Sequence, residues 1–155
     1  MQRSDRERYS YDTHDALQGR PWVHRVFGHI FRGPNAQHGE DLFFRTVAER
    51  ASASHTLELG CGNGGVAERL VNETDATVLA TDISTRQIKQ AQARAVKGRL
   101  EFRELNAEDP ISGQYDLIYG RGVLHHVNFR PVLERLASEN LNKGGAMVFR
   151  EPLGA

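Results

Sequence analysis

The sequence predicts an α/β domain in which helices cover both faces of a doubly wound parallel sheet. From residue 55 onward, short apolar runs rich in β-branched residues alternate with segments whose apolar residues recur at helical spacing. A glycine-rich loop follows the first of these runs. With 155 residues, 39% hydrophobic and 26% charged, the chain is long enough for one buried core with a solvated surface. Strands and helices that alternate in this way form parallel sheets.

The N-terminal segment differs from the rest of the chain. Residues 1–20 are polar, and a stripe of large apolar residues at helical spacing follows between Trp22 and Phe31. A second helical segment comes before residue 55. We therefore predict an N-terminal helical lid or cap over residues 1–40 and a main domain over residues 41–155.

From residue 55 onward, five strands and three helices are predicted. The apolar runs predict strands at 55–59, 76–81, 100–105, 115–119 and 146–149. A helix is expected at 66–71, and Pro131 opens another at a position where proline is tolerated. Ser84 and Gln87 form the pattern of a capping box, which predicts a helix that buries Ile88, Ala91, Ala95 and Val96.

The loop after the first predicted strand contains several glycines, which let a ligand approach the backbone. About 20 residues further on, Asp82 ends the second strand, where a carboxylate can bind ribose hydroxyls. Gly60, Gly62 and Gly65 also fit the dinucleotide fingerprint, so the loop alone leaves two ligand classes open. Glu58 favours a cationic ligand, because a carboxylate at the mouth of the site would repel a pyrophosphate.

The loop resembles motif I of the class I S-adenosylmethionine-dependent methyltransferases over residues 57–64. Four further segments resemble family motifs in order and spacing, and the resemblance covers about residues 40–152; the segments are Asp82-Ile83, Asn106-Ala107-Glu108, 120–127 and 141–145. The resemblance implies a Rossmann-like fold and S-adenosylmethionine as cofactor. It also implies the cofactor-binding residues, which are Glu58, Gly60, Cys61, Gly62, Gly64, Asp82, Ile83, Asn106, Ala107, Glu108 and Arg121.

Two features depart from the family pattern. Asn106 stands where many members have aspartate, although an amide oxygen still accepts a hydrogen bond from an adenine amino group. The family fold has seven strands and the sequence predicts five, so we expect a chain cut short after its fifth strand. That strand would then lie at an exposed edge of the sheet, and an exposed edge favours self-association.

The resemblance implies methyl transfer to a small-molecule acceptor. His125 and His126 follow the fourth predicted strand, on the ligand side of the sheet, and are candidate general bases. The alternative for these histidines is a purely structural role. Two other functions stay open: a catalytically inactive binding or scaffold domain, and a nicotinamide-dependent oxidoreductase.

Composition sets further expectations. The 20 basic and 20 acidic residues cancel, which gives no charge excess for binding nucleic acid or a membrane surface. The single cysteine, Cys61, is expected to pack in the loop and not to act as a nucleophile, and no cluster of metal ligands surrounds it. One cysteine and a charged N-terminus favour a cytoplasmic protein.

Overall fold

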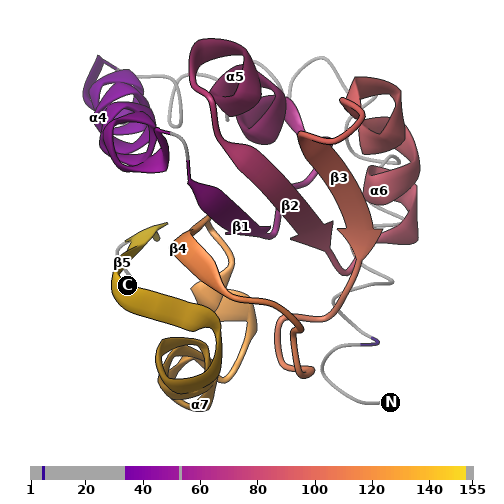
Figure 1. Ribbon diagram of the computed structural model, residues 1–155, viewed down its shortest axis with the longest axis vertical. Helices are drawn as coiled ribbons and strands as arrows, with labels where there is room; N and C mark the ends of the chain where they lie inside the picture. The colour runs from indigo at the N-terminus through magenta and orange to yellow at the C-terminus, as the bar shows by residue number, and fades with distance from the viewer. Residues whose placement is uncertain (1–4, 6–33, 53, 153–155) are drawn as a thin grey trace.

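The predicted parallel sheet is present in the structure. The structure, a computed structural model, describes residue 5 and residues 34–52 and 54–152. Within this part, five parallel strands pair in the order β3-β2-β1-β4-β5 (Figure 1). The strands are β1 (His55–Leu59), β2 (Thr77–Asp82), β3 (Leu100–Glu104), β4 (Tyr115–Arg121) and β5 (Leu141–Arg150). All five predicted strands are therefore confirmed. The first four agree within two residues at each end, whereas β5 begins five residues earlier than expected.

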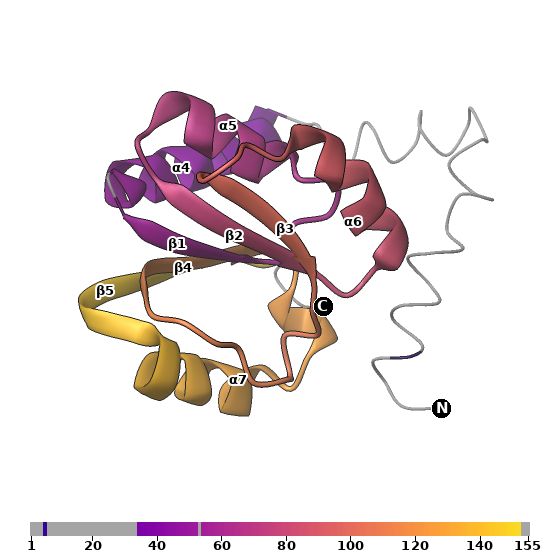
Figure 2. The same cartoon turned by 45° about the vertical axis from the view of Figure 1, so that its right-hand side comes forward.

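Helices cover both faces of this sheet. On one face lie α4 (Pro34–Ala51), α5 (Gly65–Glu73) and α6 (Thr85–Ala91), and α7 (Phe129–Arg135) lies on the other (Figure 2). Each face has its own apolar core, because the short central strands are buried on both sides. Alternate residues of β1 contribute to the two sides: Leu57 and Leu59 join the core under α7.

Helix α4 is part of the helical layer and not a separate cap. Phe43, Phe44, Val47 and Ala51 are buried in the same core as α5 and α6. The expected boundary after residue 40 falls inside this helix. The predicted helical stripe between Trp22 and Phe31 lies outside the described residues.

Two helices differ in detail from the sequence prediction. Ser84 caps α6 as expected, since its hydroxyl accepts a hydrogen bond from the backbone N–H of Gln87. The α6 helix ends at Ala91, and a short 3-10 turn, η1 (Gln92–Arg94), follows it. Ala95 and Val96, expected on the buried stripe, are exposed because the backbone becomes extended there.

The remaining elements connect the second half of the sheet. A 3-10 turn, η2 (Leu124–His126), follows β4, and Asn128 is the residue that precedes α7. Pro131 lies in the first turn of α7, where its missing N–H breaks no helical hydrogen bond. A π-helical turn, η3 (Leu136–Asn140), leads into β5. Among the described helices, none is long and apolar enough to cross a membrane.

Candidate cofactor and active site

The order of the strands reverses between β1 and β4, and a cavity lies at the carboxyl ends of the strands beside this point. Residues from four strand ends and the loops after them line it. Of the residues expected to bind a cofactor, the cavity is lined by Gly60, Gly62, Asp82, Ile83, Asn106, Ala107, Glu108 and Arg121. Segments that are far apart in the sequence therefore meet at one place.

Asp82 joins the glycine loop to the start of α6. One carboxylate oxygen accepts a hydrogen bond from the Gly62 N–H at 2.8 Å, and the other accepts one from the Ser84 N–H at 2.9 Å. These two bonds orient the Asp82 carboxylate at the end of β2, where the residue lines the cavity.

The glycine loop lies close to the turn after β4. Gly60 has a φ of +68°, a conformation that disfavours other residues, and a Cβ there would lie 3.0 Å from the Cβ of Val123. A Cβ on Gly62 would meet nothing within 4 Å. The loop therefore packs tightly on one side and presents bare backbone on the other.

The segment after β3 is fixed by α7. Arg135 donates hydrogen bonds to the backbone carbonyls of Ala107 at 2.6 Å and Glu108 at 2.7 Å. The side chain of Glu108 accepts a hydrogen bond from the Asn128 N–H, just before α7 begins. Asn106 accepts one from the Glu108 N–H. This wall of the cavity is therefore held in place before any ligand binds.

Arg121, at the end of β4, forms an ion pair with Glu40 of α4 at 2.6 Å. Arg150, at the end of β5, binds the other oxygen of the same carboxylate at 2.5 Å. Glu40 thus joins α4 to two adjacent strand ends. Arg121 reaches the cavity wall while its guanidinium is directed to Glu40.

Glu58 lies behind the loop and not at the mouth of the site. Its side chain is on the sheet face under α4 and α5, in register with Tyr119, and only 3% of the residue is exposed. Burial raises the pKa of Glu58 to about 8, although the nearby Tyr119 hydroxyl and Arg121 oppose this shift. One carboxylate oxygen of Glu58 is buried without a hydrogen-bond partner. The expected position at the mouth of the site is therefore wrong. Successive side chains of β1 point to opposite faces of the sheet, and Glu58 points to the face under α4 and α5.

Two other predicted residues of the loop do not line the cavity. Cys61 is buried in the core, and burial raises the pKa of its thiol far above the ordinary value. Gly64 faces Phe102 of β3 and Ala91 of α6. Both residues shape the loop from behind.

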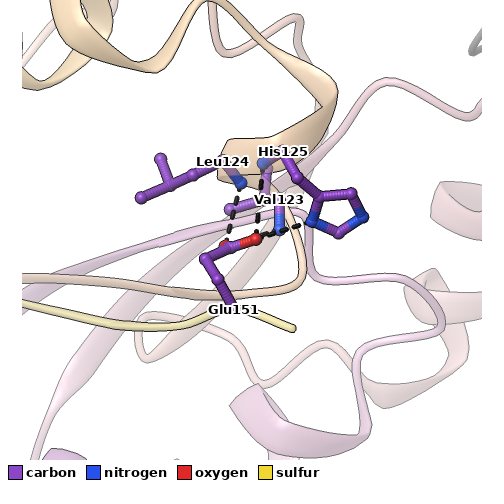
Figure 3. A network of polar contacts seen from close by, with 4 residues as sticks. All are labelled: Val123, Leu124, His125 and Glu151. Carbon is purple, nitrogen blue, oxygen red and sulfur yellow. Dashed lines mark hydrogen bonds and ion pairs between the residues drawn. The ribbon is translucent and has the colours of Figure 1, made fainter. Parts of the chain in front are cut away.

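The two candidate histidines have different surroundings. His126 lines the cavity, whereas the ring of His125 binds the carboxylate of Glu151 at 2.6 Å (Figure 3). The two imidazole rings lie against each other, with their centroids 3.9 Å apart.

Sequence reasoning missed several functional candidates. Gln87 lines the cavity although its pattern indicated only a helix cap, and Leu105, Val123 and Val127 add apolar surface. A carboxylate that follows the last strand carries no sequence signal for its partners, so Glu151 was not recognised. In the described part of the chain, no group of three or more His, Cys, Asp or Glu residues could hold a metal ion.

The chain is similar to methyltransferases. A family model described as a methyltransferase domain matches residues 57–147. The 27-O-demethylrifamycin SV methyltransferase of Amycolatopsis mediterranei is 33% identical over 97 residues, which are 59% of this chain and 36% of that protein. The trans-aconitate 2-methyltransferase of Deinococcus radiodurans is 29% identical over 125 residues, which are 80% of this chain and 47% of that protein. The chain thus spans less than half the length of these two relatives.

The fold is also shared with solved structures. The magnesium protoporphyrin IX methyltransferase of Synechocystis PCC 6803, solved with S-adenosylmethionine bound, superimposes with a TM-score of 0.70 at 21% identity. The match covers 95% of this chain and 80% of that chain.

Proposed function

We propose that this chain, which belongs to the methyltransferase-domain family of class I S-adenosylmethionine-dependent enzymes, binds S-adenosylmethionine and catalyses methyl transfer to a small-molecule acceptor. The observation that carries the proposal is the cavity at the reversal of strand order, where the glycine loop, Asp82 and the 106–108 segment meet. Ligands of doubly wound sheets bind at this point.

The residues present fit the parts of this cofactor. Asp82 would hold the ribose hydroxyls, and Ile83 and Leu105 offer apolar surface to the adenine ring. Asn106 would accept a hydrogen bond from the adenine amino group. The backbone of the glycine loop leaves room for the cofactor, because a Cβ on Gly62 would meet nothing within 4 Å.

The cofactor supplies an activated methyl group on a sulfonium. The chain has to hold the acceptor atom close and aligned, exclude water and accept a proton where the acceptor is a hydroxyl or an amine. His126 is the better candidate base, because it lines the cavity and His125 does not. Family membership makes the inactive scaffold and the nicotinamide-dependent oxidoreductase the weaker alternatives.

Calorimetry with S-adenosylhomocysteine tests the cofactor assignment. In Asp82→Ala, ribose hydroxyls would lose a charged acceptor, so we expect affinity to fall by about 1.5–3 kcal/mol. Asp75→Ala, which removes an exposed carboxylate away from the cavity, is the matched control and should bind as the wild type does. Tight binding of NAD with no binding of S-adenosylhomocysteine would reject the proposal.

Labelled methyl transfer tests the base, with a panel of small hydroxyl, amine and carboxylate compounds as acceptors. For a hydroxyl or amine acceptor, His126→Gln should reduce turnover by a factor on the order of 10²–10⁴ and leave cofactor affinity unchanged, whereas a carboxylate acceptor needs no base and should be methylated at the wild-type rate. His125→Gln provides the comparison on the neighbouring ring. Full activity in both variants would assign a structural role to the two histidines.

Two further properties belong to the same proposal. A cytoplasmic location is supported by the single cysteine of the chain, Cys61, which is buried as a thiol. Self-association through β5 is supported by the place of that strand at one edge of the sheet. Cell fractionation tests the location.

A further inference from the structure

The carboxylate of Glu151 collects four hydrogen-bond donors from the turn after β4. One oxygen accepts from the backbone N–H groups of Val123 and Leu124, both at 2.9 Å. The other accepts from the His125 N–H at 3.3 Å and contacts the His125 ring nitrogen Nδ1 at 2.6 Å. Figure 3 shows these groups converging on the side chain of Glu151, which follows β5.

These backbone groups need an external partner. N–H groups at the start of a helical turn have no acceptor inside that turn, and η2 begins at Leu124. Val123, the residue before η2, has no side-chain oxygen to act as a cap. Glu151, which follows β5 directly, therefore acts as the cap of this turn, although it lies far from the turn in the sequence.

The capped turn forms one wall of the cofactor cavity. Val123, His126 and Val127 line this cavity, and the side chain of Val123 lies against the glycine loop at Gly60. A shift of the turn would therefore move the candidate base and the wall that faces the loop together.

The surroundings of Glu151 favour its ionised form, which is the form that accepts hydrogen bonds with both oxygens. Although burial opposes it, hydrogen bonds from His125 and from the three backbone N–H groups lower the pKa of Glu151. Hydrogen bonds to an ionised carboxylate are stronger than those between neutral groups. Its partner ring remains partly open to solvent, with 42% of the His125 side chain exposed.

We propose that Glu151 is a positioning residue for the cofactor site: its carboxylate fixes the turn at residues 123–126 and so places Val123 and His126 at the cavity wall. This inference rests on the proposed function, because it assigns the turn to the binding of S-adenosylmethionine. It adds to the site a residue beyond the matched residues 57–147.

Calorimetry with S-adenosylhomocysteine on the full chain tests this inference. Glu151→Ala should weaken binding at least about tenfold, the scale of one hydrogen bond to a charged group. Glu151→Gln should lie between the alanine variant and the wild type, because its amide oxygen still accepts from backbone N–H groups. Glu134→Gln, an exposed glutamate of α7, is the matched control and should bind as the wild type does.

Nuclear magnetic resonance on the unliganded chain gives a second readout, which a general loss of stability would not reproduce. The Val123 and Leu124 amides should exchange with solvent slowly in the wild type and rapidly in Glu151→Ala. The ¹⁵N shifts of the His125 ring should report a proton on Nδ1 in the wild type and a mixture of tautomers in Glu151→Gln.

The outcomes separate the two claims. If the wild type does not bind S-adenosylhomocysteine, the proposed function fails. If it binds, and folded Glu151→Ala and Glu151→Gln bind equally well, the positioning role is overturned whatever their stability.

Discussion

Glu58 shows how far the chemistry of a single residue depends on the face of the strand it occupies. From the sequence, Glu58 is expected as a charged carboxylate at the mouth of the ligand site. In the structure the same residue is buried beside Tyr119, and a pKa of about 8 keeps most of it protonated at neutral pH. Periodicity indicates that neighbours point to opposite faces, but not which face holds the ligand.

This burial predicts a specific pH dependence of stability. The unfolded chain loses the Glu58 proton near pH 4.5, whereas the folded chain keeps it up to about pH 8. The contribution of Glu58 to the free energy of unfolding is therefore complete below pH 4.5, decreases as the pH rises, and is lost above about pH 8. Glu58→Gln stays neutral throughout, so its free energy of unfolding should exceed that of the wild type increasingly over this range, by up to several kcal/mol.

Urea unfolding at pH 5 and pH 8 measures this difference. Other groups titrate in the same range, so the informative quantity is the wild type compared with Glu58→Gln at each pH. Glu49→Gln, an exposed glutamate of α4, controls for the loss of one negative charge. Parallel pH profiles for the wild type and Glu58→Gln would show that Glu58 is ionised in the folded state.

Other residues of the site could be identified from the sequence. Asp82 and the 106–108 segment follow strand ends, and parallel strands bring those ends to one edge, so their meeting is predictable. The contacts of Glu151 and Glu40 with distant residues depend on tertiary packing. No local pattern encodes them.

Elements were predicted more reliably than the contacts between them. The five strands follow from apolar runs, and Ser84 caps α6 as its pattern indicates. The end of α6 was misplaced, because the helical spacing continues to Val96 although the backbone has already turned. The sequence could not show that α4 shares a core with α5 and α6.

The start of α5 depends on Gly64, which predicts a large effect of one methyl group. Gly64 has a φ of +82°, and a Cβ there would lie 2.5 Å from the Phe102 ring and 3.1 Å from Ala91. Gly64→Ala combines backbone strain with overpacking against β3 and α6. We expect it to lower the free energy of unfolding by about 2–4 kcal/mol in urea titrations.

Gly98→Ala separates strain from crowding. Gly98 also has a positive φ, +77°, but a Cβ there would meet nothing within 4 Å. In this variant only the backbone strain should lower the free energy of unfolding, by about 1–2 kcal/mol. If Gly64→Ala costs no more than Gly98→Ala, the contact between α5, β3 and α6 is looser than the structure indicates.

At the scale of the whole molecule, the sequence predicts a doubly wound parallel sheet, and the sheet is parallel, with a strand order that reverses between β1 and β4. Among the described residues, β5 lies at one edge of the sheet, as expected. Its side chains from Ala146 to Phe149 are half-buried and pack towards both apolar cores. Helices that lie above and below the sheet cover these faces, so within the described part of the chain only the backbone edge of β5 is left unpaired.

The two edges of the sheet differ in a way that predicts which one pairs with a second copy. The edge strand β3 carries exposed Glu101, Arg103 and Glu104, and charges of this kind oppose edge pairing. Residues 146–149 of β5 carry none, and among the described residues β4 is the one strand paired with β5. We therefore expect association through β5.

Sedimentation velocity should show an average mass that rises with concentration, and hydrogen exchange should show new protection at Val148 or Phe149 but none along β3. A monomer at every concentration, with slow exchange at both β5 amides, would mean that one chain covers its own edge, and association through β5 would be rejected.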